Sequence, residues 1–229
     1  MFKQIYQQEE AQKEALMAPG KAVLVYHPEL LSPVPQEALS LQVVSHEGTV
    51  LSTYQAGDWW DTLPKVTQSR RIISAQGWTQ RAEFQGVLLK SVYEDLQSRF
   101  PESFSPLQSS SGWLQQTNVC GAEEWLPLSE ALSQKALLCT HLNGTPLSPL
   151  QGGPLHLRVF HCYEHKGLPQ LQRLCFWQQA HASHLPKSQA GFWGERGYEP
   201  SGSIVPGNYF ALDLGQTKPV NKSAEVSDY

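Results

Sequence analysis

Residues 143–160, NGTPLSPLQGGPLHLRVF, carry the clearest structural signal in this chain of 229 residues. The pairs Asn143-Gly144 and Gly152-Gly153 are typical of turns, because glycine adopts backbone conformations with positive φ that other residues avoid. A leucine and a proline accompany each pair, and residues 155–160 then alternate between apolar and polar side chains as a strand does. The stretch therefore predicts two turns that lead into a core strand.

Strand patterns continue on both sides of this stretch, whereas helical patterns are few. Apolar residues at 88, 89, 92, 93 and 96 have helical spacing and predict a helix over 88–96. Other predicted helical segments cover 3–17, 58–64 and 129–134, and the Ser- and Pro-rich residues 101–111 predict a surface loop. Strands are predicted over 22–26, 39–44, 49–54, 70–75, 113–119, 136–140, 155–160, 171–177 and 209–214. Because few long helices separate the strands, the pattern favours a mixed, β-rich α+β architecture over a doubly wound sheet.

The expected organisation is a peripheral N-terminal helix in residues 1–20, one domain over 21–215 and a polar tail over 216–229. No internal repeat divides the central part. A chain of this size with 40% hydrophobic residues can bury a substantial core.

Composition narrows the classes of partner. Seventeen basic and 21 acidic residues give a formal net charge of −4, and the basic residues form no stripe, which argues against broad capture of nucleic acid. The composition does not exclude a local site for a small anionic ligand. No apolar run is long enough to span a bilayer, and the N-terminus lacks the apolar segment of a signal peptide, so no membrane association and a cytoplasmic location are expected. The four cysteines form no C-x-x-C pair, which favours reduced thiols.

Six segments carry recognisable motifs: N-G-T-P-L at 143–147, G-G-P-L at 152–155, G-F-W-G-E-R-G-Y at 191–198, S-A-Q-G-W within 71–78, F-Q-G-V-L-L at 84–89 and L-P-L at 126–128. Together they resemble the molybdopterin-binding domain of the sulfite oxidase type of oxidoreductase. In the same order, that family shows N-G-x-P-L, H-G-x-P-L-R-L, G-F-W-E-E-R-G-Y, C-x-x-G-W, W-x-G-V-P-L and L-P-L, and it also has a basic Y-G-Y-K segment whose lysine corresponds to Lys166. This resemblance implies the family's fold over roughly residues 39–200 and a molybdenum cofactor-dependent oxidoreductase that performs two-electron oxygen-atom transfer.

The resemblance also implies roles for individual residues. In the family, a cysteine thiolate at the position of Ser74 binds molybdenum as a soft donor, so Ser74 occupies the metal-ligand position with a harder hydroxyl. Cys120 is a candidate replacement thiolate and, with Ser74, a candidate catalytic residue. The family's histidine and arginine in the strand entry are Gln151 and His156, and its lysine-tryptophan pair falls at 169–170. The remaining candidate contacts to the cofactor are Arg71, His156, Arg158, His161, His165 and Lys166.

Two alternatives stay open from the residues. The first is a non-catalytic module on the same fold that binds a pterin or another small anion, or a protein partner. The second is a small zinc-binding protein, because His161, Cys162 and His165 offer imidazole and thiolate donors at close spacing. The chain contains no Walker loop, no G-x-G-x-x-G fingerprint and no G-x-S-x-G elbow, which disfavours nucleotide-binding and serine hydrolase classes.

Overall fold

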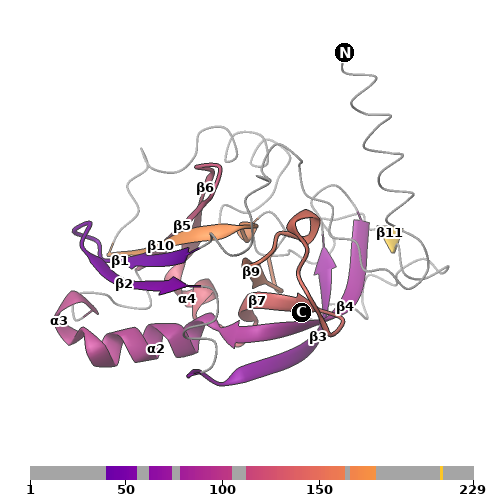
Figure 1. Ribbon diagram of the computed structural model, residues 1–229, viewed down its shortest axis with the longest axis horizontal. Helices are drawn as coiled ribbons and strands as arrows, with labels where there is room; N and C mark the ends of the chain where they lie inside the picture. Colours follow the sequence, from indigo (N-terminus) through magenta and orange to yellow (C-terminus); the bar gives the residue numbers. More distant parts are fainter. Residues whose placement is uncertain are drawn as a thin grey trace, which may run out of the picture.

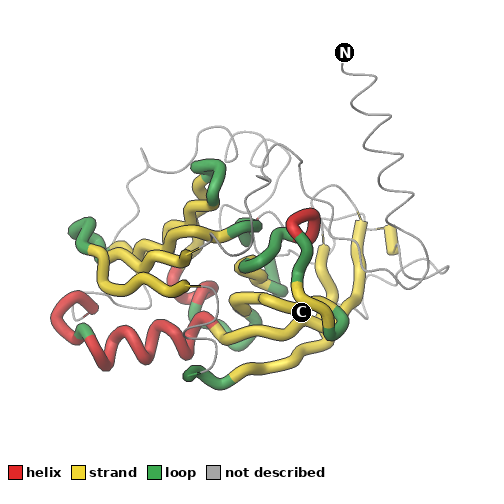
Figure 2. Tube along the Cα trace, viewed as in Figure 1, coloured by secondary structure: helices red, strands yellow, loops and turns green. Residues whose placement is uncertain are grey.

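A computed structural model describes residues 40–55, 62–73, 78–104, 112–162, 166–178 and 212–213. Within these ranges two β-sheets pack together, with the longest helix along one side (Figures 1 and 2). This mixed, sheet-rich arrangement confirms the predicted α+β class.

The first sheet has the strand order β2-β1-β10-β5-β6. Neighbouring strands are antiparallel except β1 and β10, which run parallel. The strand joined to β1 thus comes from near the end of the described chain. The bounds are β1 Ser40–Val44, β2 Val50–Gln55, β5 Trp113–Asn118, β6 Glu123–Pro127 and β10 Leu171–Trp177.

The second sheet is built around two long strands. Strand β4 pairs with β3 along its length and with β7 and β11, and β7 also pairs with β8 and β9. The segment quoted first thus supplies the strands β8 and β9 beside β7. The bounds are β3 Lys65–Ile73, β4 Trp78–Leu88, β7 Ala136–Leu142, β8 Thr145–Pro146, β9 His156–Val159 and β11 Leu212–Asp213.

Short helices connect the strands. Helix α2 buries one face, which carries Leu89, Val92, Tyr93 and Leu96, against the core between the two sheets. A second, smaller core is formed mainly by residues of the second sheet and includes Phe84, Leu137 and Cys139. The bounds are α2 Leu89–Arg99, α3 Pro101–Phe104, α4 Leu128–Ala131 and the 3-10 helix η3 Pro149–Gln151.

The two predicted turns are confirmed. Asn143 and Gly144 both have positive φ in the hairpin between β7 and β8, and Gly152 has φ 88° at the end of η3. The peptide bond between Gly153 and Pro154 is cis. These turns set the direction in which β9 enters the sheet.

Several sequence predictions were wrong in part. Residues 62–64, the described end of the helix predicted over 58–64, are not helical. Residues 101–104 form α3 instead of a loop, because proline is well suited to the first position of a helix and Phe104 is buried there. Strand β3 begins five residues earlier than predicted, at Lys65, and strands β4 and β6 were missed. The predictions over 3–17, 22–26, 58–61, 105–111 and the tail lie outside the described residues, as do Ser74, His165 and the 191–198 motif.

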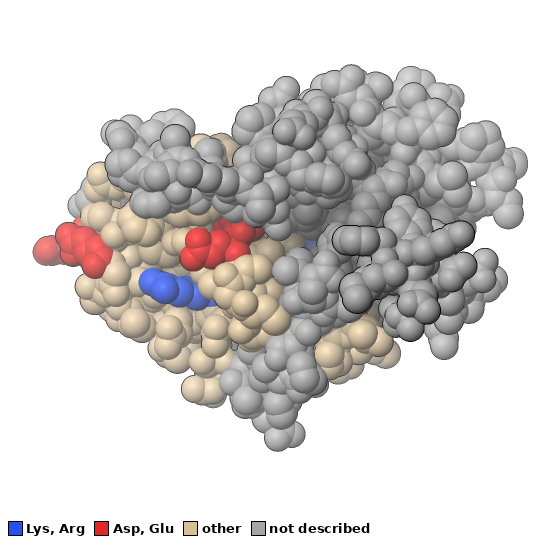
Figure 3. Space-filling view, turned by 90° about the horizontal axis from the view of Figure 1, so that it is seen from above, with Lys and Arg blue, Asp and Glu red and all other residues tan. Residues whose placement is uncertain are grey.

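Within the described residues no helix is long and apolar enough to cross a membrane. On the face shown in Figure 3, described acidic residues stand beside a basic one, and the described basic residues form no continuous patch.

Candidate functional site

Strand β9 carries two buried basic side chains on one face. His156 and Arg158 are two residues apart, and their exposed fractions are 0% and 3%. Across the strand pair they stand opposite Cys139 and Leu137 of β7, both of which belong to the second core. We refer to His156 and Arg158 together as the basic face of β9.

The imidazole of His156 is buried close to two backbone carbonyls. Its Nδ1 atom lies 3.2 Å from the carbonyl oxygen of Gln151, and the ring also interacts with the backbone of Gly167; both contacts by themselves raise the pKa of the ring. Burial lowers the pKa of His156 well below its ordinary value, and the positive charge of Arg158 lowers it further. A Cβ atom at Gly152 would lie 2.4 Å from Nδ1, so only glycine there leaves room for this ring position.

The thiol of Cys139 faces the same two basic residues across the β7–β9 pair. Burial raises its pKa to about 11, although the nearby charge of Arg158 acts in the opposite direction. Its Sγ donates a hydrogen bond to the carbonyl of His141 at 3.1 Å. At neutral pH this sulfur is a protonated thiol, which is a poor ligand for a metal.

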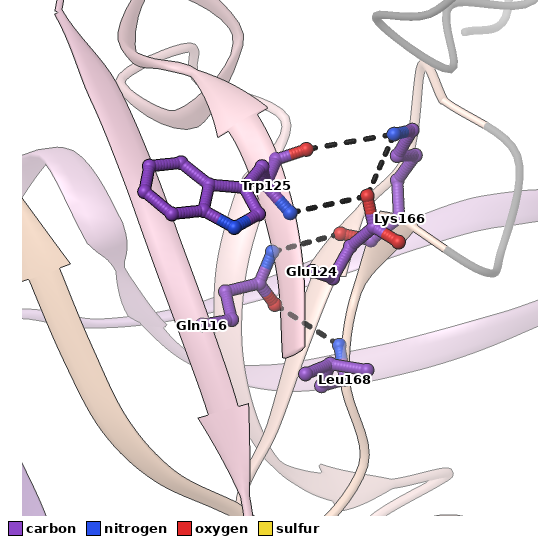
Figure 4. A network of polar contacts seen from close by, with 5 residues as sticks. All are labelled: Gln116, Glu124, Trp125, Lys166 and Leu168. Atoms are coloured by element: carbon purple, nitrogen blue, oxygen red, sulfur yellow. Dashed lines mark hydrogen bonds and ion pairs between the residues drawn. The ribbon is translucent and has the colours of Figure 1, made fainter. Parts of the chain in front are cut away.

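Lys166 takes part in a buried polar network that joins β5 and β6 to the segment before β10 (Figure 4). Its Nζ lies 2.7 Å from Glu124 Oε1 and 3.5 Å from the carbonyl oxygen of Trp125. Gln116 binds the same segment, donating to the Lys166 carbonyl at 2.9 Å and accepting from the Leu168 N–H at 3.0 Å. The charge of Lys166 is therefore balanced inside the protein.

Glu124 is the acidic member of this network, and only 2% of it is exposed. Burial raises the pKa of its carboxyl, while Lys166 and the N–H of Trp125, which lies 3.1 Å from Oε1, oppose that increase. The pair thus fixes the position of Lys166 at the cost of removing two charges from water.

The other described candidates among the predicted site residues lie on elements other than β9. Arg71 is buried on β3 opposite Arg81, and β4 and β7 stand between β3 and β9. Cys120 is exposed in the turn between β5 and β6, where its N–H donates to Asn118 Oδ1. Ser74 and His165 lie outside the described residues.

His161 has different neighbours. Its Nε2 contacts Glu130 Oε2, and Cys162 follows directly in the chain. Of the predicted cofactor contacts, the structure therefore brings His156 and Arg158 together and separates them from Arg71, and it pairs both His161 and Lys166 with carboxylates.

Sequence reasoning missed the partners of these residues. No motif marks Gln116, Glu124 or Glu130 in the sequence, and each of them contacts a residue 31 to 50 positions away. The only available signal was the placement of Glu124 directly before the apolar pair Trp125-Leu126, which is unusual for a solvated carboxylate.

Comparison with known proteins identifies a family and two relatives. The family model described as the oxidoreductase molybdopterin binding domain matches residues 61–185. An uncharacterised oxidoreductase of Bacillus subtilis (strain 168), YuiH, is 27% identical over 152 residues, which cover 66% of this chain and 68% of that protein.

Among solved structures, the sulfane dehydrogenase SoxCD from Paracoccus pantotrophus is similar, with a TM-score of 0.54 and 14% sequence identity. The match covers 66% of this chain and 41% of that chain, so this chain spans less than half of the dehydrogenase chain. At this level of identity the likeness shows a shared fold.

Proposed function

The chain belongs to the oxidoreductase molybdopterin binding domain family, and on that premise we propose that it holds a molybdenum cofactor through the basic face of β9. The observation that carries the proposal is the burial of His156 and Arg158 side by side on one strand of the matched region. A buried guanidinium holds its positive charge where water screens it little, so it attracts an anion more strongly than an exposed guanidinium does. An anionic ligand is therefore the class of ligand that this face would favour.

The donors on this face fit the phosphate of a pterin cofactor. Arginine offers a permanently charged, planar fork of N–H donors that matches phosphate oxygens, and the positive charge persists at every accessible pH. The neutral His156 adds a ring that the tight turn at Gly152 fixes in place. When bound, the cofactor would supply two-electron, oxygen-atom-transfer chemistry, and the chain's own residues would hold and orient it.

A second candidate function is a non-catalytic domain that binds a pterin or another small anion. Position 74 carries serine where the family has its metal-ligand cysteine, and the described thiol beside Arg158, Cys139, has its pKa raised to about 11. Lys166, which matches a basic position of the family, is paired with Glu124. These three observations favour retention of the anion-binding part of the site over retention of the metal-binding part.

One experiment tests the proposal and separates the two candidates. The full chain is produced in a host that synthesises the cofactor, the bound pterin is oxidised to a fluorescent derivative and quantified, and molybdenum is measured by mass spectrometry. We expect pterin in the wild type, strongly reduced pterin in Arg158→Gln and partial retention in Arg158→Lys, which keeps the charge without the fork. Arg173→Gln, which changes an exposed arginine on β10, is the matched control.

The metal content then decides between catalysis and binding alone. Molybdenum equal to pterin supports the oxidoreductase, and pterin without molybdenum supports the non-catalytic domain. Absence of pterin from a folded wild type, or equal pterin in the Arg158 and Arg173 variants, contradicts the proposed role of the basic face of β9.

A further inference from the structure

We propose that Glu130, His161 and Cys162 form a binding site for a zinc ion, independent of the basic face of β9. Each of the three residues offers one ligand atom, and these atoms all lie within 4.8 Å of one another. Two residues in a turn and one on a helix 31 positions earlier thus converge on a single point. The proposal does not depend on whether the chain binds a molybdenum cofactor.

The donor chemistry selects the metal. A thiolate sulfur, an imidazole nitrogen and a carboxylate oxygen are the three ligand types that Zn²⁺ accepts, and three protein ligands with an open fourth position are a common arrangement. Calcium and magnesium prefer all-oxygen sites and are disfavoured by the sulfur and the nitrogen. One thiolate and one carboxylate would also neutralise the two positive charges of the ion, which suits a partly buried place.

The backbone that carries these donors is well anchored. In the turn after β9, the N–H of Cys162 donates to the Val159 carbonyl at 2.9 Å, and the N–H of Phe160 donates to the Lys135 carbonyl at the same distance. Helix α4, which carries Glu130, is fixed by the buried side chains of Leu128 and Ala131. The donors therefore require little rearrangement to meet a metal ion.

The site lies at the border between the core and the solvent. Cys162 is 2% exposed and packs in the main core, whereas the side chains of His161 and Glu130 are 18% and 29% exposed. A metal ion can therefore enter from the side of the imidazole and the carboxylate and reach the sulfur from there.

The imidazole of His161 supplies a second observation. Its Nε2 contacts Glu130, while its Nδ1 is buried and has no hydrogen-bond partner among the described residues. A buried nitrogen without a partner costs free energy, and coordination of a metal by Nδ1 would offset this cost.

Binding would be accompanied by release of a proton. The Cys162 thiol loses its proton to the buffer as the zinc–sulfur bond forms, and the imidazole and carboxylate bind through lone pairs without further exchange. The metal would then join α4 to the end of β9 and stabilise the folded chain by mass action.

The test uses the full chain after removal of metals with a chelator. Calorimetry with zinc should give one ion per chain, with proton release visible as a dependence of the heat on the buffer. Cobalt should give the near-ultraviolet charge-transfer absorption of a thiolate ligand. The absorption should disappear in Cys162→Ala, and zinc affinity should fall about tenfold or more in His161→Gln and Glu130→Gln.

Two thiol controls make the result specific. Cys120→Ala removes an exposed thiol and Cys175→Ala removes a buried one on β10, and both should retain zinc affinity and the cobalt absorption. If Cys162→Ala does not fold, the variants of His161 and Glu130 decide the question through zinc affinity. The proposal is overturned if the wild type binds no zinc, if the absorption depends on Cys120, or if neither His161 nor Glu130 affects affinity.

Discussion

Replacement of Lys166 with methionine should lower the free energy of unfolding at pH 7 by about 3 kcal/mol. The variant keeps an unbranched apolar chain but loses the ammonium 2.7 Å from Glu124 Oε1. The carboxyl of Glu124, 2% exposed, then keeps only the N–H of Trp125 as its described partner in the network. Such a carboxyl relieves the unpaired charge by taking up a proton.

The expected loss of stability follows from the free energy needed to protonate the Glu124 carboxyl at pH 7. The ordinary pKa of the carboxyl is 4.5, so protonation at pH 7 costs about 1.4 kcal/mol for each of roughly 2.5 pH units, or about 3.4 kcal/mol. This value agrees with the roughly 3–5 kcal/mol lost when one partner of a buried pair is removed. In wild type, the attraction of Lys166 offsets part of the burial cost of Glu124.

Urea unfolding followed by tryptophan fluorescence measures the effect, at pH 7 and at pH 5.5. In Lys166→Met the folded carboxyl has a higher pKa than the unfolded one, so the folded chain binds more protons between these values. Its free energy of unfolding should therefore rise relative to wild type as the pH falls, by up to about 2 kcal/mol over 1.5 pH units.

The double variant Glu124→Gln/Lys166→Met removes both charges while the glutamine carbonyl can still accept from Trp125. We expect it to lie within about 1 kcal/mol of wild type at pH 7. The reasoning is refuted if Lys166→Met loses less than about 1 kcal/mol, if its loss is the same at both pH values, or if the double variant is less stable than the single one.

Three further predictions concern other buried positions. The pKa of Cys139 is raised from 9.0 to about 11, so the unfolded thiol loses its proton at a lower pH than the folded one, and the free energy of unfolding should fall by roughly 2–3 kcal/mol between pH 9 and 11. Urea unfolding should show a smaller decline over this range in Cys139→Ala, and an unchanged decline would contradict the prediction. The pKa of His156 in the folded chain is well below 6.5, so just below pH 6.5 only the unfolded chain protonates this imidazole, and the free energy of unfolding should fall by up to about 1.4 kcal/mol for each pH unit below 6.5. If His156→Gln loses stability in acid as steeply as wild type, His156 makes no such contribution. Gly86→Ala would place a Cβ 2.0 Å from the carbonyl oxygen of Leu138 and should lower the free energy of unfolding by about 3 kcal/mol. Gly121→Ala has open space around its Cβ and should lower it by only about 1 kcal/mol, because of the positive φ. Equal losses of thermal stability in the two variants would show that the close contact at Gly86 is not what destabilises the chain.

Local patterns predicted much of the fold. The helical spacing of apolar residues predicted α2, and alternation predicted strands such as β1, β5 and β10, because these elements bury one face against the core. Strand β4 was missed although Ala82 and Phe84 are buried and alternate with exposed Arg81 and Glu83. Strand β4 contains many polar residues, which have a low propensity for strands, so the sequence does not indicate it. Pairing with β3 and β7 stabilises the strand despite this low propensity.

The candidate sites were predictable only in part. The proximity of His156 and Arg158 follows from their spacing of two on a strand, which can be read in the sequence. The pairing of Lys166 with Glu124 could not be read, because it joins residues 42 positions apart across different elements. The same holds for Glu130, since nothing in the short segment Leu128–Ala131 indicates which distant turn it faces.

The parallel pairing of β1 with β10 has a consequence for the order of assembly during synthesis on the ribosome. Ser45 and Cys175, at the ends of the paired region, are 130 positions apart and share a hydrogen bond. Strands β1 and β2 can form a hairpin early, but their other neighbour emerges only after nearly all of the matched domain has been translated. An edge of β1 then stays open to incorrect pairing throughout that interval, so this protein should benefit from chaperones that shield nascent strands.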